Sequence, residues 1–148
     1  MNRVIIMRGI PGSGKSHYVK ENYPYAVVCS ADEYFMAGGE YQFDPARLGE
    51  VHQLCFARFI ESVKAEAPVI VVDNTNVHLW EFMNYKSVAN LAGYEIEIVD
   101  MVVHTIEELR ICIERNSHGV PSEIISRMAL SMEVHRDVTC HGTEIDVK

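Results

Sequence analysis

The segment that most constrains the fold is Arg8–Ser16, Arg-Gly-Ile-Pro-Gly-Ser-Gly-Lys-Ser, which directly follows the apolar run Val4–Met7. It matches the Walker A pattern G-x-x-x-x-G-K-[ST] between an expected buried strand and the start of a helix. Glycines lack a Cβ, so the backbone can adopt positive φ and turn its amides inward around an anion. A helix beginning near Lys15 directs its unpaired N–H groups and positive dipole end to the same concavity. The sequence therefore predicts a phosphate-binding loop, and a glycine-rich turn that binds nothing is the alternative.

Two side chains would contact a nucleoside triphosphate and its metal ion in this loop. Lys15 would reach the β- and γ-phosphates, and the Ser16 hydroxyl would ligate Mg²⁺. ATP and Mg²⁺ are therefore the expected ligands. The residues expected to bind ATP are Gly9, Pro11, Gly12, Ser13, Gly14, Lys15 and Ser16.

Length and charge limit the classes of protein that fit. The 148 residues suit one domain, and 13 basic against 21 acidic residues give a net charge of −8. This charge argues against holding long nucleic acid by phosphate neutralisation alone. The start, Met1-Asn2-Arg3, has no hydrophobic signal region, and no apolar run approaches the roughly 20 residues that span a bilayer. We expect a single cytoplasmic domain over residues 1–148 with no membrane segment.

The four cysteines have no C-x-x-C spacing, and three of them lie within apolar patterns. Reduced thiols in the core are therefore expected, rather than disulfides or a zinc site. The four are Cys29, Cys55, Cys112 and Cys140. A metal site at Cys140-His141 with the nearby His135 is the alternative.

Short apolar runs alternate with helical patterns along the chain, which is typical of a three-layer α/β/α fold with a mostly parallel sheet. The expected strands are residues 4–7, 25–29, 69–72 and 96–103. The expected helices cover residues 15–23, 44–67 and 77–92, with two more between 105 and 133. Asp44 is the expected N-cap of the long second helix, with Pro45 at its first position. Its buried stripe is expected to be Leu48, Val51, Cys55, Phe59 and Val63, and Gly93 is expected to close the following helix.

Acidic residues follow two of the expected strands. Asp32 and Glu33 come after residues 25–29, and Asp73 and Asn74 come after residues 69–72. In an open α/β sheet the carboxyl ends of the strands line the ligand crevice, so these residues should share an edge with the phosphate loop. An acid ending an apolar strand is typical of a Walker B aspartate, which helps to hold Mg²⁺. Alternatively, residues 73–76 cap the following helix, and both functions can coexist.

Two further segments are expected near the site. Residues 36–43 have no clear period and are interpreted as a loop over the acceptor site. Residues 105–133 read as helix, turn, helix, with a capping box at Thr105–Glu108, Ser122 capping the second helix and arginines near the turn. This pattern is typical of a lid that excludes water and brings positive charge to the γ-phosphate. Residues 134–148 form a polar tail, either with an edge strand at 143–145 or without regular structure.

Four motifs together resemble one group of P-loop kinases, which contains the kinase domain of phage polynucleotide 5′-kinases and a set of AAA-like ATP-binding proteins. The motifs are Gly9–Ser16, Ser30–Tyr34, Asp73–Asn76, and Arg115–Pro121 with Ser126–Met128. They occur in the family's order, and the resemblance extends over residues 3–132, nearly the whole chain. The resemblance implies an α/β P-loop NTPase fold with a helical lid, formed as a single kinase-like domain.

The same resemblance implies roles for individual residues. The carboxylate that matches Asp32 is the family's general base, which takes the proton from the acceptor 5′-hydroxyl, as a hydroxyl attacking an in-line γ-phosphate requires. The family's lid arginine matches Arg115, which would stabilise charge on the transferring phosphoryl group. Lys15, Asp32 and Arg115 are thus the expected catalytic residues, and Ser16 and Asp73 the expected metal ligands.

The acceptor side departs from the family. The polynucleotide kinases carry an arginine three residues after the base, where this chain has Phe35, and His118-Gly119 stands where the lid has a second arginine. The phage enzyme also has a neutral residue at the position of Asp73. The expected acceptor-side residues are Glu33, Tyr34, Phe35 and Asn74. A kinase acting on a short nucleic-acid 5′ end, a kinase acting on a small hydroxyl compound, and an ATP-binding or slow ATPase module without an acceptor all remain open.

Overall fold

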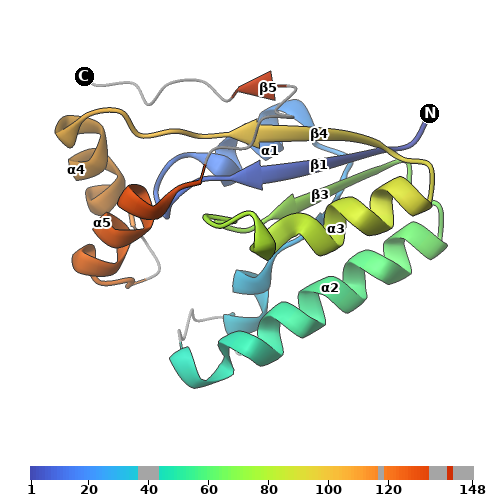
Figure 1. Cartoon of the computed structure of the whole chain (residues 1–148), viewed down its shortest axis with the longest axis horizontal. Helices are drawn as coiled ribbons and strands as arrows, with labels where there is room; N and C mark the ends of the chain where they lie inside the picture. The colour runs from blue at the N-terminus through green and yellow to red at the C-terminus, as the bar shows by residue number, and fades with distance from the viewer. Residues whose placement is uncertain (37–43, 117–118, 134–139, 142–148) are drawn as a thin grey trace.

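In the part of the chain that the structure describes, five parallel strands form a sheet at the centre of the molecule (Figure 1). The computed structural model describes residues 1–36, 44–116, 119–133 and 140–141. The strands are β1 (Arg3–Arg8), β2 (Val27–Cys29), β3 (Val69–Asp73), β4 (Glu95–Asp100) and β5 (Cys140–His141). Their order in the sheet is β2-β3-β1-β4-β5. The strand that leads into the phosphate loop is therefore central, with β3 and β4 on either side.

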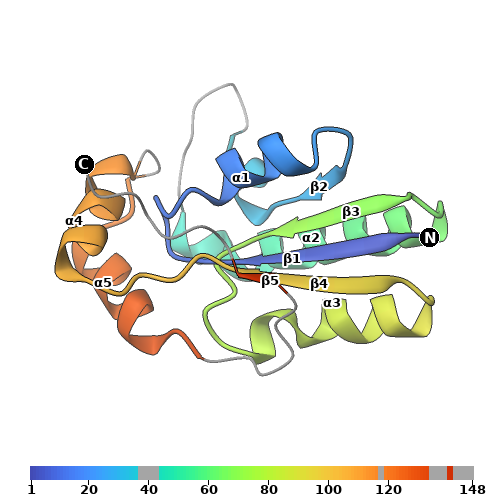
Figure 2. The same ribbon diagram turned by 90° about the horizontal axis from the view of Figure 1, so that it is seen from above.

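Helices cover both faces of this sheet (Figures 1 and 2). The helices are α1 (Lys15–Asn22), α2 (Leu48–Lys64), α3 (Trp80–Leu91), α4 (Ile106–Arg115) and α5 (Ser122–Ser131), with short 3₁₀ turns η1 (Ala31–Phe35) and η3 (Pro45–Arg47). Alternate residues of a strand point to opposite faces, so the side chains of β1 divide between two cores. Val4 and Ile6 pack with residues of α2 and α3, whereas Ile5 and Met7 pack with Val19 of α1. The result is the expected three-layer α/β/α fold.

Three helix boundaries lie where capping residues in the sequence predict them. Asp44 Oδ1 accepts a hydrogen bond from Ala46 N at 3.0 Å, with Pro45 as the first residue of η3. Gly93 takes φ +77° directly after α3, as the expected glycine at a helix end does. Thr105 Oγ1 accepts from Glu108 N at 3.1 Å at the start of α4. These three expectations are confirmed.

Several expected boundaries and burial assignments were wrong. β2 is only Val27–Cys29, and Tyr25, expected inside that strand, lies in a turn with 99% of its surface exposed. Leu48 is 38% exposed because it is the first residue of α2, before the helix reaches the sheet, although Val51, Cys55 and Phe59 are fully buried.

Two helix starts were also misplaced. α3 begins at Trp80 rather than near Val77. His78 N donates a hydrogen bond to Glu81 Oε2 at 2.7 Å, and residues 74–77 lie before the helix, where they are bound to other segments of the chain. Ser122 is the first residue of α5 rather than its cap, and Pro121 occupies the N-cap position. β4 ends at Asp100 rather than at residue 103. Local sequence signals therefore placed the strands β1 to β4 and the five α-helices but missed several of their ends, and they did not predict β5 or the two 3₁₀ turns.

Some expectations fall outside the described residues. They are the loop over residues 37–43, His118 in the lid turn, and the possible metal site at His135 and possible strand at 143–145 in the tail. Within the described chain, none of the helices is both long and apolar enough to cross a bilayer.

Candidate active site

The phosphate loop connects the end of β1 to the start of α1. Gly12 and Gly14 adopt φ of +81° and +95°, and Gly14 is the N-cap of α1. A Cβ on Gly12 would lie 2.1 Å from Cys112 O in α4, so only glycine fits there. The positive φ values let the loop curl around its own lysine: Lys15 Nζ donates to Gly9 O at 2.9 Å and to Ile10 O at 3.2 Å.

The Lys15 ammonium group is desolvated and is under the electrostatic influence of two carboxylates. Burial lowers the pKa of Lys15, while the negative charges of Asp73 and Asp32 act in the opposite direction. A bound phosphate would add negative charge and favour the protonated lysine. The residue is therefore suited to binding an anion in the loop.

Ser16 and Asp73 meet at the mouth of the loop. Ser16 Oγ donates to Asp73 Oδ2 at 3.2 Å, and Asp73 is the last residue of β3. Hydroxyl and carboxylate oxygens are ligands that Mg²⁺ accepts, and Mg²⁺ usually completes its shell with water and substrate phosphates. Among the described residues no group of three or more His, Cys, Asp and Glu side chains forms a protein cage for a metal. The pair fits a magnesium ion that arrives with a nucleotide.

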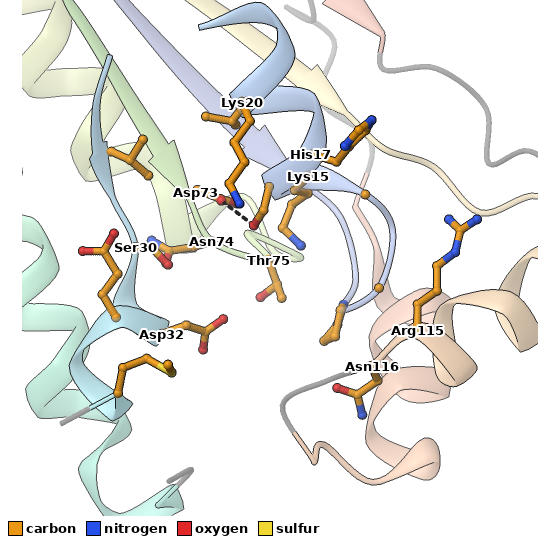
Figure 3. Close-up of a pocket in the computed structure, with 18 residues that line it drawn as sticks. Lys15, His17, Lys20, Ser30, Asp32, Asp73, Asn74, Thr75, Arg115 and Asn116 are labelled. Carbon is orange, nitrogen blue, oxygen red and sulfur yellow. Dashed lines mark hydrogen bonds between the residues drawn. The ribbon is translucent and has the colours of Figure 1, made fainter. Parts of the chain in front are cut away.

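A cavity of about 600 Å³ opens in front of the loop (Figure 3). Its walls come from the phosphate loop and α1, from the ends of β2 and β3, and from the end of α4. It is lined by Pro11, Gly12, Gly14, Lys15, Ser16, His17, Val19, Lys20, Val28, Ser30, Asp32, Glu33, Met36, Asp73, Asn74, Thr75, Arg115 and Asn116. The expected catalytic residues Lys15, Asp32 and Arg115 thus share one cavity with the expected metal ligands. Figure 3 shows the Asp32 carboxylate directed into the cavity, opposite the phosphate loop.

Asn74 explains how η1 is held in this position. Its side-chain Oδ1 accepts from Ala31 N at 2.9 Å, and its Nδ2 lies 3.6 Å from Cys55 Sγ in α2. Ala31 is the residue immediately before Asp32, so the loop after β3 fixes the turn that carries the carboxylate. Asn74 lines the cavity and supports its acidic wall, and it does not cap α3.

Four expected site residues lie outside the cavity. Gly9 and Ser13 belong to the loop but do not line the cavity, and the buried Ser13 Oγ has no hydrogen-bond partner among the described residues. Phe35 is 2% exposed and belongs to the core between the sheet and α2, which corrects its assignment to the acceptor side. Tyr34 donates through its hydroxyl to Leu54 O at 3.3 Å, also away from the cavity. The 3₁₀ turn of η1 causes this, because it directs successive side chains to different sides.

The α4–α5 hairpin, the expected lid, is packed directly on the phosphate loop. Ile10 forms a buried cluster with Cys112 of α4 and Ile125 of α5. Arg115 and Asn116 stand at the turn between the two helices, where they reach the cavity, and Asn116 Nδ2 donates to Val120 O at 2.6 Å. Figure 3 shows both residues on the side of the loop opposite Asp32.

Sequence reasoning missed several cavity residues, of which Lys20 and His17 carry the strongest chemistry. Lys20 is four residues after Ser16, so the helical period alone puts both on one face of α1. Figure 3 shows the Lys20 ammonium group directed into the cavity, on the side of Asp73. His17 is mostly exposed, and its Nε2 lies 3.0 Å from Glu21 Oε1.

Most of the chain matches a known family and parts of longer proteins. Residues 4–134 match a family described as AAA domain. NEDD4-binding protein 2 from Homo sapiens is 34% identical over 128 residues, which cover 84% of this chain and 7% of that protein. YLP motif-containing protein 1 from Mus musculus is 27% identical, over 88% of this chain and 11% of that protein. The chain therefore spans only a small part of the relatives it matches.

Solved structures share the fold at low sequence identity. A chain of the Pnkp1/Rnl/Hen1 RNA repair complex is similar with a TM-score of 0.67 and 18% identity, over 88% of this chain and 44% of that chain. The APS kinase of Mycobacterium tuberculosis, in complex with AMPPNP and APS, is similar with a TM-score of 0.62 and 16% identity, over 96% of this chain and 88% of that chain. At these identities the likeness shows the α/β P-loop fold. Since the family model matches nearly the whole chain, this protein belongs to the family described as AAA domain.

Proposed function

We propose that the protein is an ATP-dependent phosphotransferase that moves the γ-phosphate of ATP to a hydroxyl acceptor. The observation that carries this proposal is the placement of Asp32 and the phosphate loop on opposite sides of one cavity. A loop that only bound ATP would not need a carboxylate on the opposite side of the cavity. A kinase needs one there to accept the proton of the attacking hydroxyl.

The chain's own residues supply the parts of the reaction. The amides of residues 9–14 and the Lys15 ammonium bind the phosphates, and Arg115 stabilises the charge of the transferring group. Ser16 and Asp73 would hold Mg²⁺, which neutralises phosphate charge when it is bound. The acceptor oxygen forms a bond to the γ-phosphorus while the bond from that phosphorus to the leaving ADP oxygen breaks. The acceptor proton passes to the Asp32 carboxylate.

The acceptor is proposed as a short nucleic-acid 5′ end or a small hydroxyl compound. The net charge of −8 opposes binding of a long polyanion. The burial of Phe35 leaves no side chain at that position to hold an acceptor phosphate. The structural relatives include proteins named for RNA repair and for APS phosphorylation, so the fold is compatible with either class of acceptor.

Transfer of labelled γ-phosphate across a panel of acceptors tests this function. The panel contains 5′-hydroxyl DNA and RNA oligonucleotides, nucleosides, sugars and amino-sugar nucleotides. The proposal predicts labelling of one class, dependent on Mg²⁺. Label that appears only as inorganic phosphate, with every class, would support the ATPase module instead.

A further inference from the structure

Arg8, the last residue of β1, carries a buried guanidinium that the proposed reaction does not use directly. Only 1% of the residue is exposed, and it stands immediately before the first glycine of the phosphate loop. Its Nη1 donates to Asp100 Oδ1 at 3.2 Å, and its guanidinium carbon lies 4.9 Å from the centre of the Phe82 ring. The charge is therefore neutralised by one carboxylate and stacked on one aromatic face.

The remaining donors of Arg8 bind main-chain carbonyls of two other segments and the Met132 sulfur, Sδ, at 3.5 Å. Nε donates to Asn76 O at 2.9 Å and Nη2 donates to Val77 O at 3.0 Å, both in the loop between β3 and α3. Nη2 also donates to Glu133 O at 2.6 Å, just after the end of α5. Glu133 N in turn donates to Val77 O at 3.0 Å. One side chain thus ties the phosphate-loop strand to the loop that carries Thr75 and to the end of the hairpin.

These partners include both stems of the α4–α5 hairpin. Asp100 ends β4, the strand that leads into α4, and Glu133 follows α5. The far end of the same hairpin carries Arg115 and Asn116, which line the cavity. A shift at the stems would therefore move Arg115 relative to the phosphate loop.

We propose that Arg8 is a positioning residue that sets the α4–α5 hairpin, and through it Arg115, against the phosphate loop. This inference rests on the proposed function for its kinetic consequence. A buried ion pair is weak evidence for stability by itself, whereas its fixed fork geometry specifies where its partners lie. Lysine would keep the charge at this position but cannot reach carbonyls on both sides and the carboxylate with one ammonium group.

The test compares R8K, R115A and the R8K/R115A double variant with the parent chain. R3K is the matched control, because Arg3 lies at the other end of β1, where its guanidinium carbon is 5.8 Å from the Tyr23 ring centre. Two properties are measured: the single-turnover rate of γ-phosphate loss from MgATP, to water or to the acceptor panel, and amide hydrogen exchange along the chain. D100N, which removes the charge that faces Arg8, repeats the comparison if R8K does not fold.

A positioning role predicts coupling between the two arginines. R8K should lower the rate on the order of tenfold in the parent but by less than about twofold when Arg115 is already absent. Hydrogen exchange should rise in residues 106–131 and around 75–79 with R8K and stay unchanged with R3K. The proposal would be overturned if R8K lowered the rate equally in the parent and in the R115A variant. It would also be overturned if R8K made hydrogen exchange faster evenly over the sheet. If the parent itself loses no γ-phosphate, the proposed function fails, and the exchange pattern alone then decides the role of Arg8.

Discussion

The hydroxyl of Ser16 and the carboxylate of Asp73 are joined by a 3.2 Å hydrogen bond, although the two residues lie 57 positions apart in the sequence. Ser16 lies in the first turn of α1 and Asp73 ends β3, and the parallel sheet brings both residues to the same edge. Hydrogen bonding to the hydroxyl occupies the carboxylate oxygen that a magnesium ion would take. Metal binding at this pair should therefore replace the bond between them.

Asp73→Asn should weaken the dependence of ATP binding on Mg²⁺. The amide keeps the size of the carboxylate and can still bond to Ser16, but it removes the negative charge that attracts the cation. Calorimetric titration of ATP with Mg²⁺ and with a chelator, in the parent and the variant, measures the difference. The parent should bind ATP more tightly with the metal, and the variant should show a smaller gain. A gain of the same size in both would remove Asp73 from the metal site.

Gly12→Ala should abolish ATP binding and destabilise the fold by about 2–4 kcal/mol, because the new Cβ meets backbone and the residue has positive φ. The contact is the Cys112 carbonyl oxygen at 2.1 Å, which a side-chain rotation cannot relieve. Gly49→Ala in α2 is the matched control, since no atom of the described residues lies within 4 Å of the Cβ it would add. The control should be stabilised by about 0.5–1 kcal/mol as a helical residue. Urea unfolding of both variants checks the pair, and equal stabilities would contradict the packing of α4 on the loop.

Lys20→Gln should lower ATP turnover by about threefold to tenfold, with the loss shrinking at high salt, because a cation in a wet cavity interacts moderately with phosphate. His17→Gln is the control from the same helix, because His17 lines the same cavity but is largely exposed and paired with Glu21. The control should stay near the parent rate. Identical rates for the two variants at low salt would show that Lys20 does not act on the bound phosphates.

The free energy of unfolding should fall as the pH rises above about 9. Burial raises the pKa of Cys29 from 9.0 to about 11, so the unfolded chain releases this proton first and is favoured across that interval. Burial also raises the pKa values of Cys55 and Cys112. Urea unfolding of the parent and Cys29→Ala at about pH 8 and about pH 10 measures the effect, and the variant should lose less stability on going to the higher pH. An equal loss in both would exclude a contribution from Cys29.

The parts of the site that depend on local patterns were predictable from the sequence. Glycine spacing and the preceding apolar run placed the phosphate loop, and the strand ends placed Asp32 and Asp73 at its edge. Lys20 was within reach of the same reasoning, since the helical period from Ser16 identifies it. These features depend on a few neighbouring residues, whose backbone preferences act locally.

Other features depend on contacts between distant segments, which a single sequence does not reveal. The partners of Arg8 lie 68 to 125 positions away, so its position before the loop gave no sign of the network around it. Phe35 was misplaced because an aromatic residue after a strand suits a binding surface and a core equally well, and only the packing of α2 decides. Tyr25 was misplaced for a related reason, because an aromatic beside β-branched residues has strand propensity even in a turn.

In the proposed transfer Asp32 takes the acceptor proton, and the Asp32→Asn variant removes that base. The asparagine keeps the size and hydrogen-bonding capacity of the side chain but cannot serve as a base. Calorimetry should show unchanged binding of ATP with Mg²⁺. Labelled transfer across the acceptor panel should fall by about 10²–10⁴-fold, the usual contribution of a general base. A variant that transfers label as fast as the parent would show that Asp32 is not the base that takes the acceptor proton.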